Sequence, residues 1–149
     1  MKIYNLLEKF EYAKEVIELC LNEWGNYIDE EEKQIKITNK LKKFKNKDRN
    51  EICQLILLDD MKLIGFISLL KTDSKEVNLT PWYGTMYVKH EHRGNGYSKI
   101  LNDSIIKEAK KIGYKKLYLK TDLINYYEKF GFIYLKKLNN GENLYYQNI

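Results

Sequence analysis

The fold of this chain is decided by one stretch of sequence, Trp82-Tyr83-Gly84-Thr85-Met86-Tyr87-Val88-Lys89-His90-Glu91-His92-Arg93-Gly94-Asn95-Gly96-Tyr97-Ser98-Lys99-Ile100-Leu101. Its first part, residues 82–88, is rich in aromatic and β-branched residues and is long enough for one strand. Beyond residue 97, apolar or small residues recur at helical spacing: Ile100, Leu101, Ser104, Ile105 and Ala109. Gly94 and Gly96 are therefore predicted to lie on a strand-to-helix turn.

Such a turn is suited to binding an anion. Gly94 and Gly96 allow backbone conformations that are closed to other residues and let a ligand approach closely. The first amides of the following helix have no partner inside the helix, and the helix dipole places partial positive charge there. Phosphate is the usual occupant of such a site. Arg93 and Lys99 are predicted to add formal positive charge beside it.

Two other glycine-rich motifs do not fit this stretch. A P-loop closes with Gly-Lys-Ser/Thr, which Gly96-Tyr97-Ser98-Lys99 does not provide. A Rossmann fingerprint needs a third glycine where Lys99 stands, and it lies early in the chain. Neither motif fits.

The turn Arg93-Gly94-Asn95-Gly96-Tyr97-Ser98 resembles the diphosphate-binding motif of the GNAT superfamily of acyl-coenzyme A-dependent N-acetyltransferases, Arg/Gln-x-x-Gly-x-Gly/Ala. Ser98 departs from the usual last residue but is also small. A second motif, Tyr126-Tyr127-Glu128-Lys129-Phe130-Gly131-Phe132, resembles the later signature of the same family, a Tyr four residues before Gly-Phe. The order and separation of the two motifs also match. Their joint occurrence is far more specific than either motif alone.

The resemblance implies acetyl-coenzyme A as co-substrate, with no metal. It implies that residues 93–98 (Arg93, Gly94, Asn95, Gly96, Tyr97 and Ser98) hold the diphosphate. It also implies that backbone groups of Tyr87 and Val88 pair with the pantetheine arm, and that a backbone amide of this strand faces the thioester carbonyl as an oxyanion donor. Asn125 is a weaker candidate for a pantetheine contact.

Tyr127 matches the family tyrosine that protonates the leaving thiolate. A phenol with a pKa of ~10 is protonated at neutral pH and can donate as the sulfur becomes basic. The alternative is that Tyr127 only packs its ring. Tyr126 is the neighbouring competitor, but adjacent residues of a helix point about 100° apart, so one of the two is expected to face the thioester. The motif register favours Tyr127.

The sequence assigns neither a general base nor the acceptor. Residues 82–88 contain no carboxylate, whereas many family members have a glutamate there. Candidates on nearby segments are Glu23, Asp29, Glu30 and Glu76, and the alternative is deprotonation through water and backbone carbonyls. His90 and His92 are better interpreted as exposed loop residues or phosphate contacts. Four aromatic residues are candidates for the wall of the acceptor site: Trp24, Tyr27, Trp82 and Tyr83. For Trp24 core packing is favoured, and Tyr27 and Tyr83 remain weak substrate-binding candidates.

Composition narrows the class of protein. The 149 residues predict one domain, and no apolar run approaches the ~20 residues of a membrane span. The net charge is +5, but the lysines are scattered in short pairs, which argues against nucleic acid and for a solvated surface. Cys20 and Cys53 have no metal-ligand spacing and are interpreted as core thiols in a reducing cytoplasm. No signal peptide is evident, so a cytoplasmic location is expected.

The predicted architecture is α/β (α+β), a single GNAT-like domain over residues 1–149 with a mixed sheet of six or seven strands and about four helices. Predicted strands cover residues 2–7, 52–58, 61–70, 82–88, 116–121, 132–138 and 144–147. Predicted helices cover residues 10–24, a segment capped by Asp29, the segment that follows the glycine turn and ends at Gly113, and a short segment ending at Phe130. Gly65 suggests a bulge or a close backbone approach.

The predicted function is transfer of an acetyl group to a primary amine, on a small molecule or on a protein amino group, by direct attack. Two alternatives stay open at this point. One is a basic nucleic-acid-binding module that uses its tyrosines for stacking. The other is a coenzyme A-binding sensor of the same fold without catalysis. A homodimer through a sheet edge is common in similar proteins.

Overall fold

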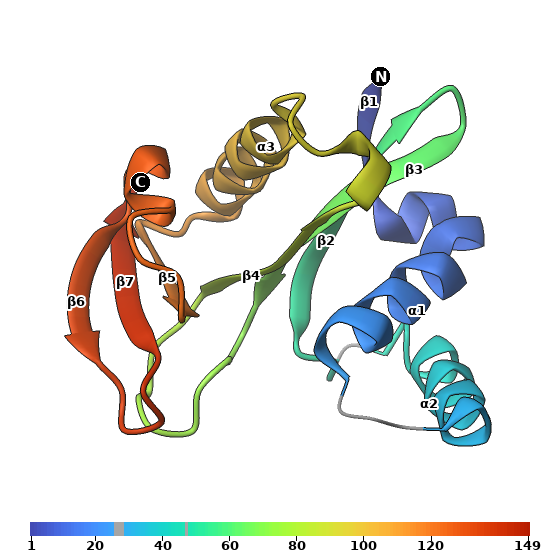
Figure 1. Ribbon diagram of the computed structural model, residues 1–149, viewed down its shortest axis with the longest axis horizontal. Helices are drawn as coiled ribbons and strands as arrows, with labels where there is room; N and C mark the ends of the chain where they lie inside the picture. Colours follow the sequence, from blue (N-terminus) through green and yellow to red (C-terminus); the bar gives the residue numbers. More distant parts are fainter. Residues whose placement is uncertain (26–28, 47) are drawn as a thin grey trace.

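The computed structural model describes residues 1–25, 29–46 and 48–149, which form a seven-stranded mixed sheet in the order β1-β2-β3-β4-β5-β7-β6 (Figure 1). The strands are β1 (Lys2–Asn5), β2 (Glu51–Asp59), β3 (Lys62–Leu70), β4 (Trp82–Val88), β5 (Lys116–Thr121), β6 (Ile133–Lys137) and β7 (Asn143–Asn148). The α-helices are α1 (Ala13–Trp24), α2 (Glu30–Lys42) and α3 (Tyr97–Ile112), and the 3₁₀ helices are η1 (Leu6–Tyr12), η2 (His90–His92) and η3 (Tyr127–Phe130). The predicted α+β class with a mixed sheet is confirmed. The fourth predicted helix is the short 3₁₀ helix η3.

Local signals placed most boundaries correctly. The Asp29 side chain accepts a hydrogen bond of 2.8 Å from the Glu32 amide and begins α2. The β2–β3 hairpin turns at Asp60 and Met61, which both have positive φ, 49° and 62°. The prediction was wrong at the end of the first strand. Here the Asn5 side chain accepts a hydrogen bond from the Leu7 amide at 2.9 Å, so β1 ends and η1 begins.

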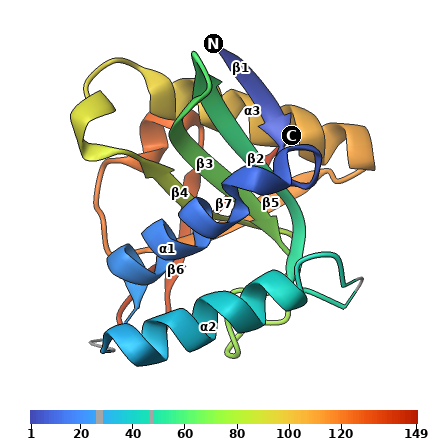
Figure 2. The ribbon, with the colours of Figure 1, turned by 90° about the vertical axis from the view of Figure 1, so that its right-hand side faces the viewer.

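Helices cover both faces of the sheet. Helix α3 packs on one face through Leu101, Ile105 and Ala109, and η1 and α1 pack on the other through Leu6, Ala13 and Val16. Figure 2 shows α1 and α2 in front of the strands and α3 behind them. Because successive residues of a strand point to opposite faces, a strand covered on both sides must be apolar throughout. The apolar runs of β2 and β3 are thus explained.

The sheet opens at its centre, between β4 and β5. These two parallel strands pair at one position of the described sheet, Trp82 with Tyr118. On its other side, β4 pairs with β3 through an irregular register, in which Phe66 pairs with Tyr87 but Ser68 pairs with Gly84. The extra residue is a bulge, and Thr85 there has a φ of 46°. Because β4 and β5 pair only at Trp82 among the described strands, the rest of the β4 edge that faces β5 is unpaired.

Candidate active site

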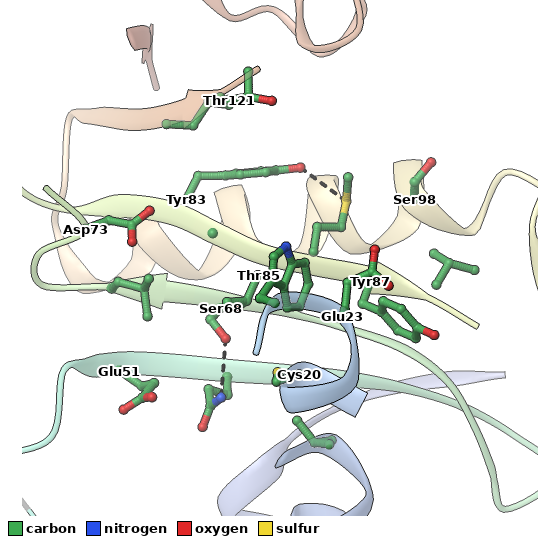
Figure 3. A pocket seen from close by; sticks show the side chains of 18 of the residues that line it. Cys20, Glu23, Glu51, Ser68, Asp73, Tyr83, Thr85, Tyr87, Ser98 and Thr121 are labelled. Atoms are coloured by element: carbon green, nitrogen blue, oxygen red, sulfur yellow. Dashed lines mark hydrogen bonds between the residues drawn. The ribbon is translucent and has the colours of Figure 1, made fainter. Parts of the chain in front are cut away.

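A cavity of about 1220 Å³ occupies the opening between β4 and β5. Its walls come from helices α1 and α2, strands β2, β3, β4 and β5, the turn before α3, and η3 with the residue preceding it. Figure 3 shows Ser98 at one end of this cavity and Asp73 and Glu51 at the other. We call these the turn end and the carboxylate end.

The turn end is built as the glycine pattern predicts. Gly94 and Gly96 have φ values of 82° and 79°, in the left-handed region that favours glycine. Gly96 is the N-cap of α3, and none of the described side chains caps that helix. Gly96, Tyr97 and Ser98 all line the cavity. A Cβ at Gly94 or Gly96 would meet nothing within 4 Å, so the space beside the turn is open, and the N-terminus of a helix suits an anion.

Polar side chains brace this turn. Arg93 Nε donates to the Val88 carbonyl at 2.8 Å, and the guanidinium lies 5.5 Å from the centre of the Tyr87 ring. Asn95 Nδ2 donates to the His92 carbonyl at 3.0 Å, so this side chain folds back on the turn and does not line the described cavity. Lys99 was predicted to add charge at the site. Instead its ammonium is 2.7 Å from Asp103 Oδ2, one helical turn away and outside the cavity.

The backbone polar groups of Tyr87 and Val88, the last two residues of β4, point to opposite edges of the strand. The Lys89 amide donates to the Ile64 carbonyl of β3 at 2.9 Å. Since backbone groups alternate along a strand, the polar groups of Val88 face the opposite, unpaired edge. The Tyr87 carbonyl lies against Gly65 of β3, close enough that a Cβ there would collide with it. The expected close approach at Gly65 is confirmed, and Val88 is the residue whose backbone faces the cavity.

Tyrosines form the wall next to β5. The Tyr127 ring is 6.0 Å from that of Tyr83 and 4.8 Å from that of Tyr126, edge to face in both cases. Burial, and to a lesser extent Tyr126, raises the pKa of Tyr127 to about 12. Tyr83 is 3% exposed, and its hydroxyl donates to Met86 Sδ at 3.4 Å. All three line the cavity, so helical spacing does not separate Tyr126 from Tyr127 as expected.

The other predicted aromatic residues lie elsewhere than expected. Trp24 was expected to pack in the core but is 51% exposed and lines the cavity, because it ends α1 where the helix leaves the sheet. Its ring is 6.2 Å from that of Tyr87. Trp82 is fully buried and donates from Nε1 to the Leu79 carbonyl at 2.7 Å, so it does not wall the cavity. Tyr27 lies outside the described residues.

Of the four carboxylates considered as bases, Glu23 lines the cavity and the others have structural partners. Asp29 caps α2, Glu30 Oε1 accepts from Gln34 at 2.9 Å, and Glu76 Oε2 accepts from the Asn139 amide at 2.9 Å. The sequence interpretation missed four other lining carboxylates: Glu51, Asp73, Asp122 and Glu142. No local motif marks them, because they come from four separate segments.

The two histidines, Asn125 and the two cysteines differ in whether they line the cavity. His92 is half-buried and lines the cavity, whereas His90 and Asn125 are exposed and are not among the described lining residues. Cys20 and Cys53 are free thiols, and burial raises the pKa of each to about 11. Cys53 is buried as expected, but Cys20 lines the cavity. Within residues 1–25, 29–46 and 48–149, no acidic, His or Cys cluster suits a metal ion, and no helix has the length and apolar character needed to cross a membrane.

Comparisons with known proteins agree with one another. The family model described as "Acetyltransferase (GNAT) family" matches residues 6–132, and no curated protein sequence matches the chain. An aminoglycoside 6'-N-acetyltransferase solved with coenzyme A has a TM-score of 0.72 at 17% identity, covering 99% of this chain and 97% of that one. A second such enzyme, from Enterococcus faecium, has a TM-score of 0.70 at 17% identity, with the same coverage. The PaiA N-acetyltransferase from Thermoplasma acidophilum, solved with coenzyme A, has a TM-score of 0.59 at 21% identity, covering both chains fully. At such identities the solved structures show a shared fold.

Proposed function

The chain belongs to the GNAT acetyltransferase family, and from this premise we propose that it transfers the acetyl group of acetyl-coenzyme A to a primary amine. The observation that carries the proposal is the open N-terminus of α3 at the end of a strand whose edge is unpaired. Gly96, Tyr97 and Ser98 line the cavity there, and no side chain of the described residues caps the helix. We take residues 1–149 to act as one domain in this reaction.

The turn end of the cavity suits the anionic part of the cofactor. The amides that begin α3, together with the helix dipole, would bind the diphosphate. Arg93 adds a cation there and fixes the turn to β4 through its 2.8 Å hydrogen bond to Val88. The pantetheine arm would then lie along the unpaired edge of β4, where the amide of Val88 is available as a donor. Such pairing is the same main-chain recognition that extends a sheet by one strand.

The wall next to β5 suits the departing thiolate. Tyr127 lines the cavity, and a pKa of about 12 keeps its phenol protonated at neutral pH. As the C–S bond breaks, the phenol can give its proton to sulfur. A backbone amide of β4 would stabilise the oxyanion that forms on the acetyl carbonyl. Tyr83 borders the same space as a candidate contact for the acceptor.

Isothermal titration calorimetry with acetyl-coenzyme A tests the cofactor site. The wild-type protein is expected to bind it, and Gly96→Trp is expected to abolish binding because the indole would fill the space before the α3 amides. Gly113→Trp is the matched control, since Gly113 ends the same helix, also has positive φ (116°) and also has no neighbour within 4 Å of an added Cβ. Unchanged binding in Gly96→Trp would place the cofactor elsewhere.

A screen identifies the acceptor class. Primary amines, among them small alkylamines, polyamines, aminoglycosides and peptides with a free amino group, are incubated with acetyl-coenzyme A while free thiol is measured. Release of thiol that depends on an amine supports the proposal. Binding of acetyl-coenzyme A without acetylation of any amine would indicate a sensor instead of an enzyme.

A further inference from the structure

The carboxylate end of the cavity contains a candidate for the missing general base. Strand β4 itself has no carboxylate, so any carboxylate that serves the acceptor must come from another element. Five of them line the described cavity: Glu23, Glu51, Asp73, Asp122 and Glu142. The five carboxylates differ in their partners, in their exposure to solvent and in their distance from β4.

Four of the five are poorly placed for this role. Glu142 is already paired, with Oε1 3.6 Å from Lys120 Nζ and 2.8 Å from Asn140 Nδ2. Glu23 and Asp122 are exposed to solvent, so water screens any interaction that they make with a substrate. Glu51 begins β2, which β3 separates from β4.

Asp73 lies beside β4. It follows β3 in the chain, is half-buried and lines the cavity. Its Oδ2 is 3.9 Å from the position that a Cβ of Gly84 would occupy, so the carboxylate lies beside Gly84 of β4. Within the described part of the chain, Asp73 makes no hydrogen bond or ion pair. Its carboxylate is therefore free to receive a ligand.

Two charged side chains act on Asp73 from neighbouring elements, Lys120 of β5 and Glu142 from the turn before β7. Burial raises the pKa of the Asp73 carboxyl, Lys120 lowers it and Glu142 raises it, with burial the largest effect. The outcome is a carboxylate with a higher proton affinity than an exposed one. Such a group suits proton transfer from an ammonium better than an ordinary aspartate.

Building on the proposed function, we propose that Asp73 pairs with the ammonium of the acceptor beside Gly84 and accepts its proton. The ammonium R–NH₃⁺ gives one proton to the carboxylate and becomes R–NH₂. The nitrogen lone pair forms the new N–C bond to the acetyl carbon, the C–S bond breaks, and the thiolate takes the proton of Tyr127. The nitrogen then loses a second proton, which restores the phenol of Tyr127. Asp73 releases its proton to solvent, so the net products are the amide, coenzyme A and one proton.

The test compares two amines of nearly equal size, ethylamine and 2,2,2-trifluoroethylamine. The ammonium form of trifluoroethylamine is far more acidic than that of ethylamine. Trifluoroethylamine is therefore mostly the neutral free amine at pH 7 and needs no base to deprotonate it. For Asp73→Asn, kcat/KM with ethylamine is expected to fall about 100-fold, whereas the value with trifluoroethylamine is expected to change by no more than about 3-fold. A purely structural role would lower both values together.

Glu76→Gln is the matched control. Glu76 lies in the same loop outside the described cavity, and the amide oxygen of Gln still accepts from the Asn139 amide. Its kcat/KM values are expected to stay within about 2-fold of wild type. Asp73→Glu, which retains a carboxylate, is expected to recover part of the ethylamine activity. Asp73→Glu replaces Asp73→Asn as the test variant if Asp73→Asn binds no acetyl-coenzyme A and is therefore misfolded.

The outcomes separate the two proposals. If wild type acetylates both amines but Asp73→Asn loses equal factors on both, or loses nothing, Asp73 is not the base and the acetyltransferase assignment stands. If wild type binds no acetyl-coenzyme A, or acetylates neither these two amines nor any amine of the acceptor screen, the proposed function and the role of Asp73 in it both fail.

Discussion

At the scale of single residues, the partners of two hydroxyl groups distinguish the tyrosines of the proposed site. Tyr127 and Tyr83 face the same cavity, yet their hydroxyls differ in their partners. The Tyr83 hydroxyl donates to Met86 Sδ at 3.4 Å and its ring is 3% exposed, which suits a wall of the site. The Tyr127 hydroxyl makes no hydrogen bond within the described residues. It is therefore the phenol that is free to reach a thiolate.

Tyr127→Phe is expected to lower kcat about 100-fold or more, because it removes the hydroxyl of the proposed general acid while the ring contacts remain. Since phenol donation requires the protonated form, and the pKa of Tyr127 is raised to about 12, the wild-type rate is not expected to fall through ionisation of Tyr127 below that pH. Steady-state kinetics with an accepted amine and calorimetry with acetyl-coenzyme A give kcat and the cofactor Kd.

Tyr126→Phe is the control, because its ring lies 4.8 Å from that of Tyr127 and lines the same cavity. It is expected to keep most of the activity. If both variants kept wild-type kcat, or if Tyr126→Phe were the slower one, Tyr127 would be a packing residue and the general acid would have to be sought elsewhere.

At the scale of elements, the site depends on the close contact of β3 and β4. Gly65 of β3 lies against the Tyr87 carbonyl, and an added Cβ would also be 3.2 Å from Leu101 Cδ1 and 3.2 Å from Val88 Cα. The strand that carries the unpaired edge is thus held between β3 and α3. A change at Gly65 should reach the cofactor site without any contact to the ligand.

Gly65→Ala is expected to reduce the free energy of unfolding by about 2–3 kcal/mol, because the new methyl group meets backbone atoms that cannot move aside. It is also expected to weaken acetyl-coenzyme A binding, since the strain displaces the Val88 end of β4. Urea unfolding and calorimetry measure the two effects.

Gly141→Ala is the matched control. Gly141 has a φ of 92° and nothing within 4 Å of an added Cβ, so the cost there is one left-handed alanine, about 1 kcal/mol, with no effect on cofactor binding. A smaller loss at Gly65 than at Gly141 would mean that β3 and β4 can separate freely.

For the whole molecule, the burial of thiol and phenol groups makes the free energy of unfolding depend on pH. Burial raises the pKa of the Cys53 thiol from 9.0 to about 11 and also raises the pKa of Cys20, Tyr83 and Tyr127. In the unfolded chain each group loses its proton at its ordinary pKa, whereas the folded protein retains the proton to higher pH. The unfolded state therefore binds fewer protons above pH 9, and stability must fall as pH rises.

The free energy of unfolding is expected to fall between about pH 9 and 11, with Cys53 contributing about 1 kcal/mol per pH unit. Urea unfolding at several pH values gives the slope, and Cys53→Ala should reduce it. Ile105→Val is the control, because it lowers stability in the same core without removing a titratable group. Equal slopes in wild type and Cys53→Ala would show that this thiol does not ionise on unfolding.

The sequence by itself determined the features that depend on a few adjacent residues. The turn at Gly94 and Gly96, the cap at Asp29 and the hairpin at Asp60 each follow from backbone preferences and hydrogen bonds within one short segment. The succession of strands and helices along the chain and the class of fold followed from the same local patterns. The motif around the turn was also enough to indicate the family.

Only the tertiary structure decided what lies around the acceptor. Trp24 lines the cavity instead of the core, Trp82 is buried instead of exposed to a ligand, and Asp73 meets Gly84 and Lys120 from segments far apart in the sequence. The single pairing of Trp82 with Tyr118, beyond which β4 and β5 separate, likewise has no local signal. Periodicity shows which face of an element is apolar. Where that face points, and what it meets, depends on long-range packing of the complete sheet against its helices.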